Sequence, residues 1–168
     1  FYVPTNFIAK KFGKKPILCL AFVLFILTYL YVTFLGLAPL GKEIQGYLLV
    51  FLAAIPLAIF GILPNAIVAD IAEADGIETG NFKAGIFFGA RTFMQKMGQM
   101  VGGLVFPSLL LLGDTPDNPL GIRLSGVTAM GFLTLGLVLF FLYNEKHILK
   151  VLAKKERLSA EEMKQIRE

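Results

Sequence analysis

The chain has 168 residues, of which 56% are hydrophobic and only 17% are charged, and its mean hydropathy is +0.71. These values argue against a soluble enzyme, because water-soluble domains carry more charge and fewer apolar residues. The formal net charge of +4 does not indicate a nucleic-acid partner, since the basic residues lie between apolar blocks and are not interleaved with aromatic side chains. We expect an integral membrane protein, because the apolar blocks are long enough to span a bilayer.

Residues 1–15 are predicted to be the end of a preceding helix and a basic cytoplasmic loop. The first nine residues have the character of the last turns of an apolar helix, and the chain begins with Phe1, so we expect further protein upstream. The loop that follows is rich in lysine and contains Lys10, Lys11, Lys14 and Lys15.

Residues 16–144 are predicted to form a segment of four transmembrane helices. The blocks 16–41 and 44–69 contain no charged residue, and each is longer than the roughly 20 residues that a helix needs to cross a bilayer. The block 84–113 is apolar and rich in glycine, but polar and cationic side chains interrupt it. The block 124–144 is again free of charge. The sequence therefore predicts an all-α membrane protein.

The block 84–113 carries a row of polar side chains at helical spacing. Thr92, Lys96 and Gln99 follow one another at intervals of four and three residues, which places them on one face of a helix. Arg91 and Gln95 form a neighbouring pair. Hydroxyl, amide and cationic groups of this kind can bind a polyol or an acidic partner. We interpret this polar row as part of a substrate or ion pathway, and interhelical hydrogen bonding without a ligand is the alternative.

Lys96 is the most deeply placed charge in this block. It lies 13 residues beyond Lys83, or about 20 Å along a helix, so its ammonium group cannot easily reach the membrane surface. Such a charge is costly in lipid and usually faces a cavity or a partner. The alternative for Lys96 is a structural ion pair with a helix outside this chain. The alternative for Arg91, which is nearer to the surface, is contact with lipid headgroups.

An acidic segment, residues 70–83, joins the second and third blocks and is predicted to be a cytoplasmic loop. Its carboxylates include Asp70, Glu73 and Asp75, and a single lysine ends it. We interpret these acids as one half of a cytoplasmic gate or latch, whose other half is the lysine-rich first loop. A solvated loop without such pairs is the alternative.

Residues 145–168 are predicted to be a cytoplasmic C-terminal tail. Seven basic and five acidic residues mark it as solvated, and Ser159 followed by Glu162 has the spacing of a capping box that begins a short helix. With four spans, 12 of the lysines and arginines fall on the side of this tail and two fall on the other side. The positive-inside rule then places the C-terminus in the cytoplasm.

The sequence contains no recognisable catalytic or metal-binding set. Its only histidine, His147, lies in the tail, and its only cysteine, Cys19, lies inside an apolar block. No phosphate-binding loop of the form G-x-x-x-x-G-K-[ST] occurs. We therefore expect no enzyme activity, no resident cofactor or metal, and no ATP hydrolysis by this chain.

Three places in the chain resemble one transporter family. They are the basic loop at residues 9–15, the acidic segment with its flanks over residues 64–85, and the pair Thr92 and Lys96. Together they are similar to the C-terminal part of a major facilitator superfamily transporter, and within that superfamily to the glycoside, pentoside and hexuronide cation symporters typified by melibiose permease. The chain departs from this pattern at Phe82, where relatives often carry a basic residue.

The resemblance implies helices nine to twelve of a twelve-helix fold in a plasma or inner membrane, with Thr92 and Lys96 facing a sugar and cation site. It further implies a sugar or sugar derivative as substrate, a sodium ion or a proton as the coupling cation, and alternating access at an interface with an N-terminal half that this chain lacks. Membrane lipid is the other expected partner. The alternative function is a structural or assembly subunit of a membrane complex without transport activity of its own.

Overall fold

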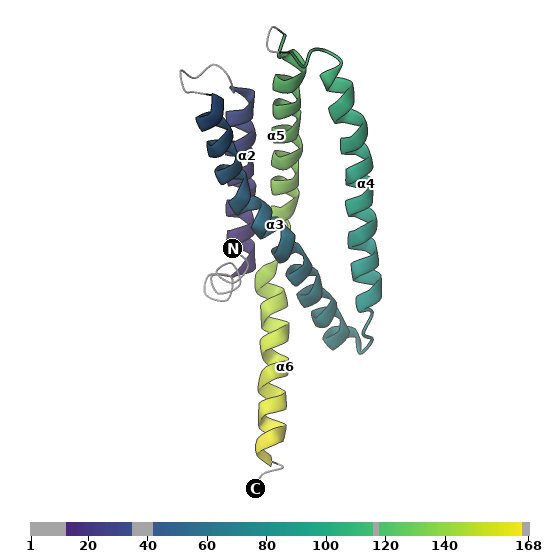
Figure 1. Cartoon of the computed structure of the whole chain (residues 1–168). Coiled ribbons are helices and arrows are strands. Elements are labelled where there is room, and N and C mark those ends of the chain that lie inside the picture. The colour runs from purple at the N-terminus through teal and green to yellow at the C-terminus, as the bar shows by residue number, and fades with distance from the viewer. Residues whose placement is uncertain (1–12, 35–41, 116–117, 166–168) are drawn as a thin grey trace.

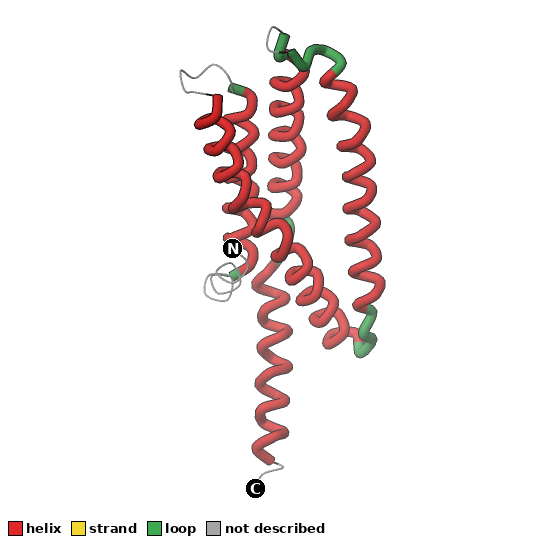
Figure 2. Tube along the Cα trace, viewed as in Figure 1, coloured by secondary structure: helices red, strands yellow, loops and turns green. Residues whose placement is uncertain are grey.

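The computed structural model describes residues 13–34, 42–115 and 118–165. Within these ranges the regular structure is helical, apart from one isolated β-bridge between Thr115 and Asn118. Figure 1 and Figure 2 show the helices, which are α2 (Lys14–Thr33), α3 (Lys42–Thr79), α4 (Ala84–Leu110), α5 (Leu120–Phe141) and α6 (Glu145–Gln165). The all-α fold class is confirmed, whereas Lys10 and Lys11 of the predicted basic loop lie outside the described residues.

The apolar core joins α2 to α3 near the start of α2. This start carries Lys14 and Lys15, and we call this end of the molecule the lysine-rich end. Its buried side chains are Ile17, Leu18 and Ala21 from α2, and Ile59, Leu63 and Ile67 from α3. In each helix their spacing of three or four residues forms one stripe that faces the other helix. The ring of Phe22 extends this contact, because it meets the ring of Phe60 edge to face at a centroid distance of 4.7 Å. α5 also packs against α2, so α2 is the central helix of the core.

Three helices of the described part of the chain, α2, α3 and α5, are long enough and apolar enough to cross a membrane. α4 has 27 residues, which is sufficient length, but Arg91 and Lys96 interrupt its apolar surface. α3 has 38 residues and continues through Pro56 and Pro64, so it is longer than a single span requires. The four predicted blocks overlap the helices α2, α3, α4 and α5, with different ends, and three of these helices have the length and composition of a membrane span.

The ends of the outer spans shift by several residues. α2 is shorter than the predicted block 16–41, because it ends at Thr33, although residues 35–41 lie outside the described part of the chain. α5 begins and ends before the predicted block 124–144, and the chain leaves helical geometry at Leu142 before α6 begins. The apolar composition of a block therefore indicates a span but not the residues at which its helix starts and stops.

The acidic segment is helical over most of its length. The sequence predicts a loop over residues 70–83, and this expectation is wrong as far as Thr79, because α3 continues to that residue. Good helix formers such as Ala72 and Ala74 favour continuation, and both are buried. The helix ends before Gly80, whose φ of 70° is the left-handed conformation common just after a helix. The carboxylates are thus held on a rigid helix.

The C-terminal tail is one continuous helix, α6, and the expected helix start at Ser159 is wrong. The helix already begins at Glu145, because Asn144 Oδ1 accepts the backbone N–H of His147 at 3.3 Å and caps the first turn. Figure 1 shows that α6 extends away from the other helices beyond the end of α5. The tail therefore projects as a helical arm from the lysine-rich end of the bundle.

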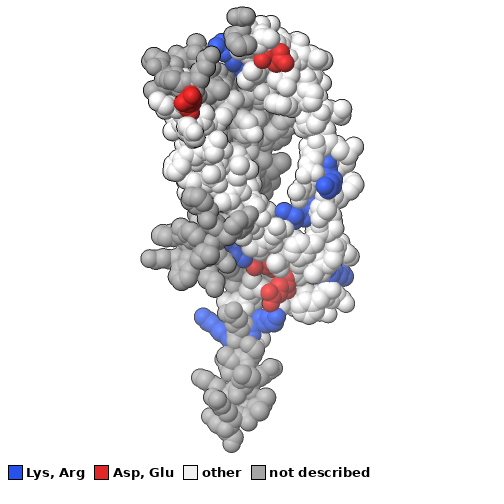
Figure 3. Space-filling view, viewed as in Figure 1, with Lys and Arg blue, Asp and Glu red and all other residues white. Residues whose placement is uncertain are grey.

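α4 contacts α3 near its start and α5 near its C-terminal end, and much of the rest of its surface is open. None of its residues is buried, and Figure 3 shows an opening between α4 and the rest of the molecule, with basic side chains beside it. Where the chain turns into α5, the N–H of Gly121 donates to the carbonyl oxygen of Gly113 at 2.8 Å. A Cβ atom on Gly121 would lie 2.4 Å from the carbonyl oxygen of Leu109, so this contact requires glycine.

Replacing Gly121 by alanine should force the ends of α4 and α5 apart, because the nearest obstacles are backbone atoms that cannot rotate away. We expect Gly121→Ala to lower the free energy of unfolding by about 1–3 kcal/mol, the usual cost of overpacking. Gly131→Ala is the matched control, since an added Cβ atom there meets nothing within 4 Å in the same helix. Thermal unfolding in detergent measures both variants, and equal melting temperatures would contradict this contact.

Candidate functional site

The predicted polar row lies on α4 with most of its side chains exposed. Lys96 Nζ donates to Gln99 Oε1 at 3.2 Å, so these two residues are in direct contact. The hydroxyl of Thr92 donates to the carbonyl oxygen of Phe88 at 2.8 Å, one turn back along the same helix. The row therefore presents an ammonium group with an amide beside it, and both remain open to a ligand.

The five predicted residues of α4 are spread over part of the helix circumference and do not all point in one direction. At about 100° per residue, Arg91 and Lys96 stand at the two edges of an arc of about 140°. Gln95, Gln99 and Thr92 lie between these edges. Arg91 alone among the five is half-buried. The arc thus has one partly covered edge at Arg91 and one open edge at Lys96.

Neither cation of α4 has an acidic partner within the described residues, because the ion pairs found there involve other side chains. A lysine or arginine at membrane depth is costly unless a carboxylate, a polar ligand or water receives it. The surroundings of Lys96 therefore suit an anionic or polyhydroxylated group that comes from outside this part of the chain.

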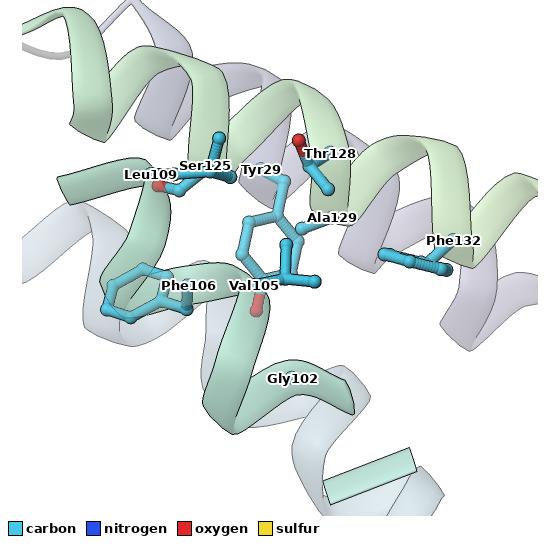
Figure 4. Close-up of a pocket in the computed structure, with 9 residues that line it drawn as sticks. All are labelled: Tyr29, Gly102, Val105, Phe106, Leu109, Ser125, Thr128, Ala129 and Phe132. Carbon is cyan, nitrogen blue, oxygen red and sulfur yellow. The ribbon is translucent and has the colours of Figure 1, made fainter. Parts of the chain in front are cut away.

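A cavity of about 200 Å³ lies between α4 and α5, as Figure 4 shows. Its lining is mostly apolar but includes three residues with hydroxyl groups, Tyr29 from α2 and Ser125 and Thr128 from α5. The ring of Tyr29 lies between the two helices in Figure 4. Lys96 does not line this cavity, so the polar row and the cavity are separate features. The sequence did not predict this cavity, and its only signal there is the pair of hydroxyl residues, Ser125 and Thr128, in an apolar block.

A group of charged residues lies where α2 begins. Lys14 Nζ lies 2.6 Å from Asp70 Oδ2 and 3.4 Å from the carbonyl oxygen of Ala66, so Lys14 holds the start of α2 against α3. The two charged side chains are only 27% and 20% exposed. Solvent and salt therefore screen this pair less than they screen a surface pair. Two of the residues predicted for the gate are thus in direct contact.

The start of α2 is also bound to the residues that connect α5 and α6. One carboxylate oxygen of Glu145 accepts the backbone N–H groups of Lys14 and Lys15, at 2.6 and 3.0 Å, and caps the first turn of α2. In return, Lys15 Nζ donates to the carbonyl oxygens of Phe141, at 2.9 Å, and Tyr143. Lys15 therefore binds backbone carbonyl groups rather than the acids expected for it.

Tyr143 lies beyond the end of α5, inside this junction. Burial, followed by the nearby carboxylates of Glu145 and Asp70, raises the pKa of its phenol to about 12. The phenol is therefore neutral at physiological pH. Its ring stacks on Phe140 at a centroid distance of 5.6 Å, and the Lys15 ammonium lies 5.9 Å from the ring centre.

The other acids at the end of α3 contact α6. Glu73 Oε1 accepts a hydrogen bond from Lys155 Nζ at 2.8 Å. Glu78 Oε1 lies 3.1 Å from His147 Nε2. These side chains are about half exposed, so each pair contributes little by itself. Asp75 forms no ion pair within the described residues. The tail helix, which the sequence did not indicate as a partner, thus supplies Lys155 and His147 as the partners of Glu73 and Glu78.

The chain matches the family described as MFS/sugar transport protein over residues 4–145. The matched region includes α2, α3, α4 and α5, and with them the polar row of α4 and the Lys14–Asp70 pair. No curated protein and no solved structure matches the chain. Because the match extends over most of the residues, the chain belongs to the MFS/sugar transport protein family.

Proposed function

We propose that this chain is part of a secondary active transporter that moves a sugar or sugar derivative across the membrane by alternating access, in symport with a cation. The match to the MFS/sugar transport protein family over residues 4–145 carries the proposal. Three helices suited to a membrane and the polar row of α4 support it. The resemblance of the sequence to melibiose permease-like symporters supports a sodium ion or a proton as the coupling cation.

The polar row of α4 offers the groups that bind a sugar. The Thr92 hydroxyl, the Lys96 ammonium and the Gln99 amide are donors or acceptors that match sugar hydroxyls. The described helices leave this row uncovered, which suits an interface with a second, N-terminal half of the transporter. In that arrangement Lys96 holds the substrate directly, or it pairs with the carboxylate that takes up the coupled cation.

Loss of the Lys96 ammonium should strongly reduce coupled uptake. We expect Lys96→Ala to lower sugar uptake about tenfold or more, the cost of one charged hydrogen bond. Lys96→Arg should also lower uptake, because a planar guanidinium cannot replace a compact ammonium group. Lys83→Ala is the matched control, since Lys83 lies at the end of the same helix. Uptake of labelled sugar by cells that express the full-length protein measures all three variants, with membrane insertion checked separately.

Wild-type uptake in both Lys96 variants would contradict a role in the substrate or cation path. If neither the variants nor the unmodified protein transports any sugar, while the protein still assembles in the membrane, the structural-subunit alternative is favoured.

The Lys14–Asp70 pair is proposed as part of a gate that closes the lysine-rich end of the transporter. It ties α2 to α3 directly, and the Glu73–Lys155 contact ties α3 to α6. An alternating-access protein must break such contacts when that end opens. Several modest pairs of this kind can bias the closed state while still allowing it to open.

Charge reversal at this pair should impair transport, and reversal of both partners should restore part of it. Asp70→Lys places an ammonium beside Lys14, so we expect uptake to fall about fivefold or more, equivalent to about 1 kcal/mol. Adding Lys14→Asp recreates the pair in the opposite sense. Asp114→Lys makes the same charge change in the exposed turn between α4 and α5 and is the control. Normal uptake by Asp70→Lys would exclude this gate.

The excess of lysine and arginine on one side supports a cytoplasmic C-terminus in a plasma or inner membrane. A reporter that is active only in the cytoplasm, fused after Glu168, should therefore be active. The same reporter inserted after Asp114 should be silent. This residue lies in the turn from α4 to α5, at the other end of α5 from the tail helix α6. The reverse pattern would overturn the orientation.

A further inference from the structure

A second cavity, of about 580 Å³, lies at the lysine-rich end of the bundle, where the start of α2 meets the connection between α5 and α6. It is separate from the polar row of α4 and from the cavity between α4 and α5. The lining residues that matter here are Lys15, Cys19, Phe141, Glu145 and Lys146. They come from two segments more than 120 residues apart in the chain, so folding alone brings them together.

The position of this cavity fixes its surroundings. α2 begins at Lys14 and α5 ends at Phe141, so the cavity lies at the level where two apolar spans end. Its lining includes the apolar side chains of Cys19 and Phe141, and Phe141 is 60% exposed. In a membrane this is the boundary between acyl chains and headgroups. The lining of the cavity therefore combines apolar and charged side chains, as a phospholipid combines acyl chains and a charged headgroup.

The polar side of the cavity carries an excess of positive charge. Lys15 and Lys146 both line it, and neither forms an ion pair within the described residues. Lys15 Nζ is held by two neutral carbonyl oxygens and keeps a third N–H for another acceptor. The one acid in the lining, Glu145, is already bound to two backbone N–H groups at the start of α2. The cavity is therefore suited to bind an anion with several acceptor oxygens.

We propose that this cavity binds the phosphate headgroup of an anionic phospholipid, with Lys15 and Lys146 as the cationic contacts and Phe141 beside the upper part of an acyl chain. The two ammonium groups match a phosphodiester, and basic pockets between helices at the cytoplasmic side are typical sites for such lipids. A lipid fits better than free phosphate because the lining includes the exposed apolar side chain of Phe141, and Leu142, which follows it in the chain, is 81% exposed. Binding would tie α2 to the α5–α6 connection.

Cys19 provides a direct probe of this cavity, because it lines the wall and is the only cysteine of the chain. The full-length protein is reconstituted in nanodiscs of phosphatidylcholine alone or with phosphatidylglycerol added. The rate of Cys19 alkylation by a small neutral maleimide is then followed by mass spectrometry, with Cys19→Ser defining the background. A bound headgroup should shield the thiol, so alkylation should be slower with phosphatidylglycerol present.

The matched pair Lys146→Gln and Lys154→Gln separates this site from general attraction between a basic helix and an anionic surface. Both residues are exposed on α6, but only Lys146 lines the cavity. We expect Lys146→Gln to weaken phosphatidylglycerol binding about fivefold, the effect of one lysine near a lipid surface, and to remove the protection of Cys19. Lys154→Gln and the charge-conserving Lys146→Arg should keep the protection.

Three results would overturn the proposal. The first is an equal alkylation rate in the two kinds of nanodisc. The second is the same loss of protection in Lys146→Gln and Lys154→Gln, which would indicate only surface attraction. The third is full protection by inorganic phosphate in phosphatidylcholine nanodiscs, which would identify the site as one for free phosphate. Sugar uptake is not measured in any arm, so the outcome is independent of the transport proposal.

Discussion

The backbone groups at helix ends are the constraint on which the lysine-rich end of this structure depends. α2 begins and α5 ends in the same region, and each helix end leaves N–H or C=O groups without a partner inside its own helix. The two helix ends supply partners for each other: the Glu145 carboxylate accepts the first backbone N–H groups of α2, and the Lys15 ammonium donates to the carbonyl oxygens of Phe141 and Tyr143 at the end of α5 and just beyond it. Each charge also has the sign that the neighbouring helix dipole favours. The buried core of α2 and α3 starts one turn away, so these caps and the apolar packing stabilise the same joint.

α4 differs from α2, because packing against the described chain covers little of its surface. No residue in it is buried, and added methyl groups at Gly89, Gly98 or Gly102 would meet nothing. A helix with small residues at such intervals is suited to close contact with another helix, and the described chain supplies none there. The polar row with Lys96 lies on this same helix. A helix with an exposed lysine and uncovered glycines is suited to contact with a second body, whereas α2, which packs on two neighbours, is suited to holding one body together.

Composition and spacing were sufficient for the parts of the fold that depend on local sequence. Apolar blocks located α2, α3, α4 and α5, and the interval between Lys96 and Gln99 placed two contacting side chains on one face. Among features that depend on distant residues, only the contact between Asp70 and the lysine-rich first loop was indicated by the sequence, through their opposite charges. The same clustering of charge suggested a loop at Asp70 and Glu73, yet both are helical in α3, and Glu73 pairs with Lys155 of α6 instead of the first loop. The cap on α2 likewise comes from Glu145, 131 residues beyond Lys14.

The uninterrupted length of α3 has a mechanical consequence. At 38 residues it measures about 57 Å, far more than the roughly 30 Å of hydrocarbon, so a single continuous helix is long enough to span a membrane and still extend to its acidic tip. Pro64 removes one backbone hydrogen bond within this helix and provides a point of compliance. Glu73 and Glu78, which contact α6, lie 9 and 14 residues beyond Pro64, so a tilt of about 10° there would displace them by about 2 and 4 Å. Their present distances to Lys155 and His147 are 2.8 and 3.1 Å, so a displacement of this size directed away from α6 is enough to break both contacts.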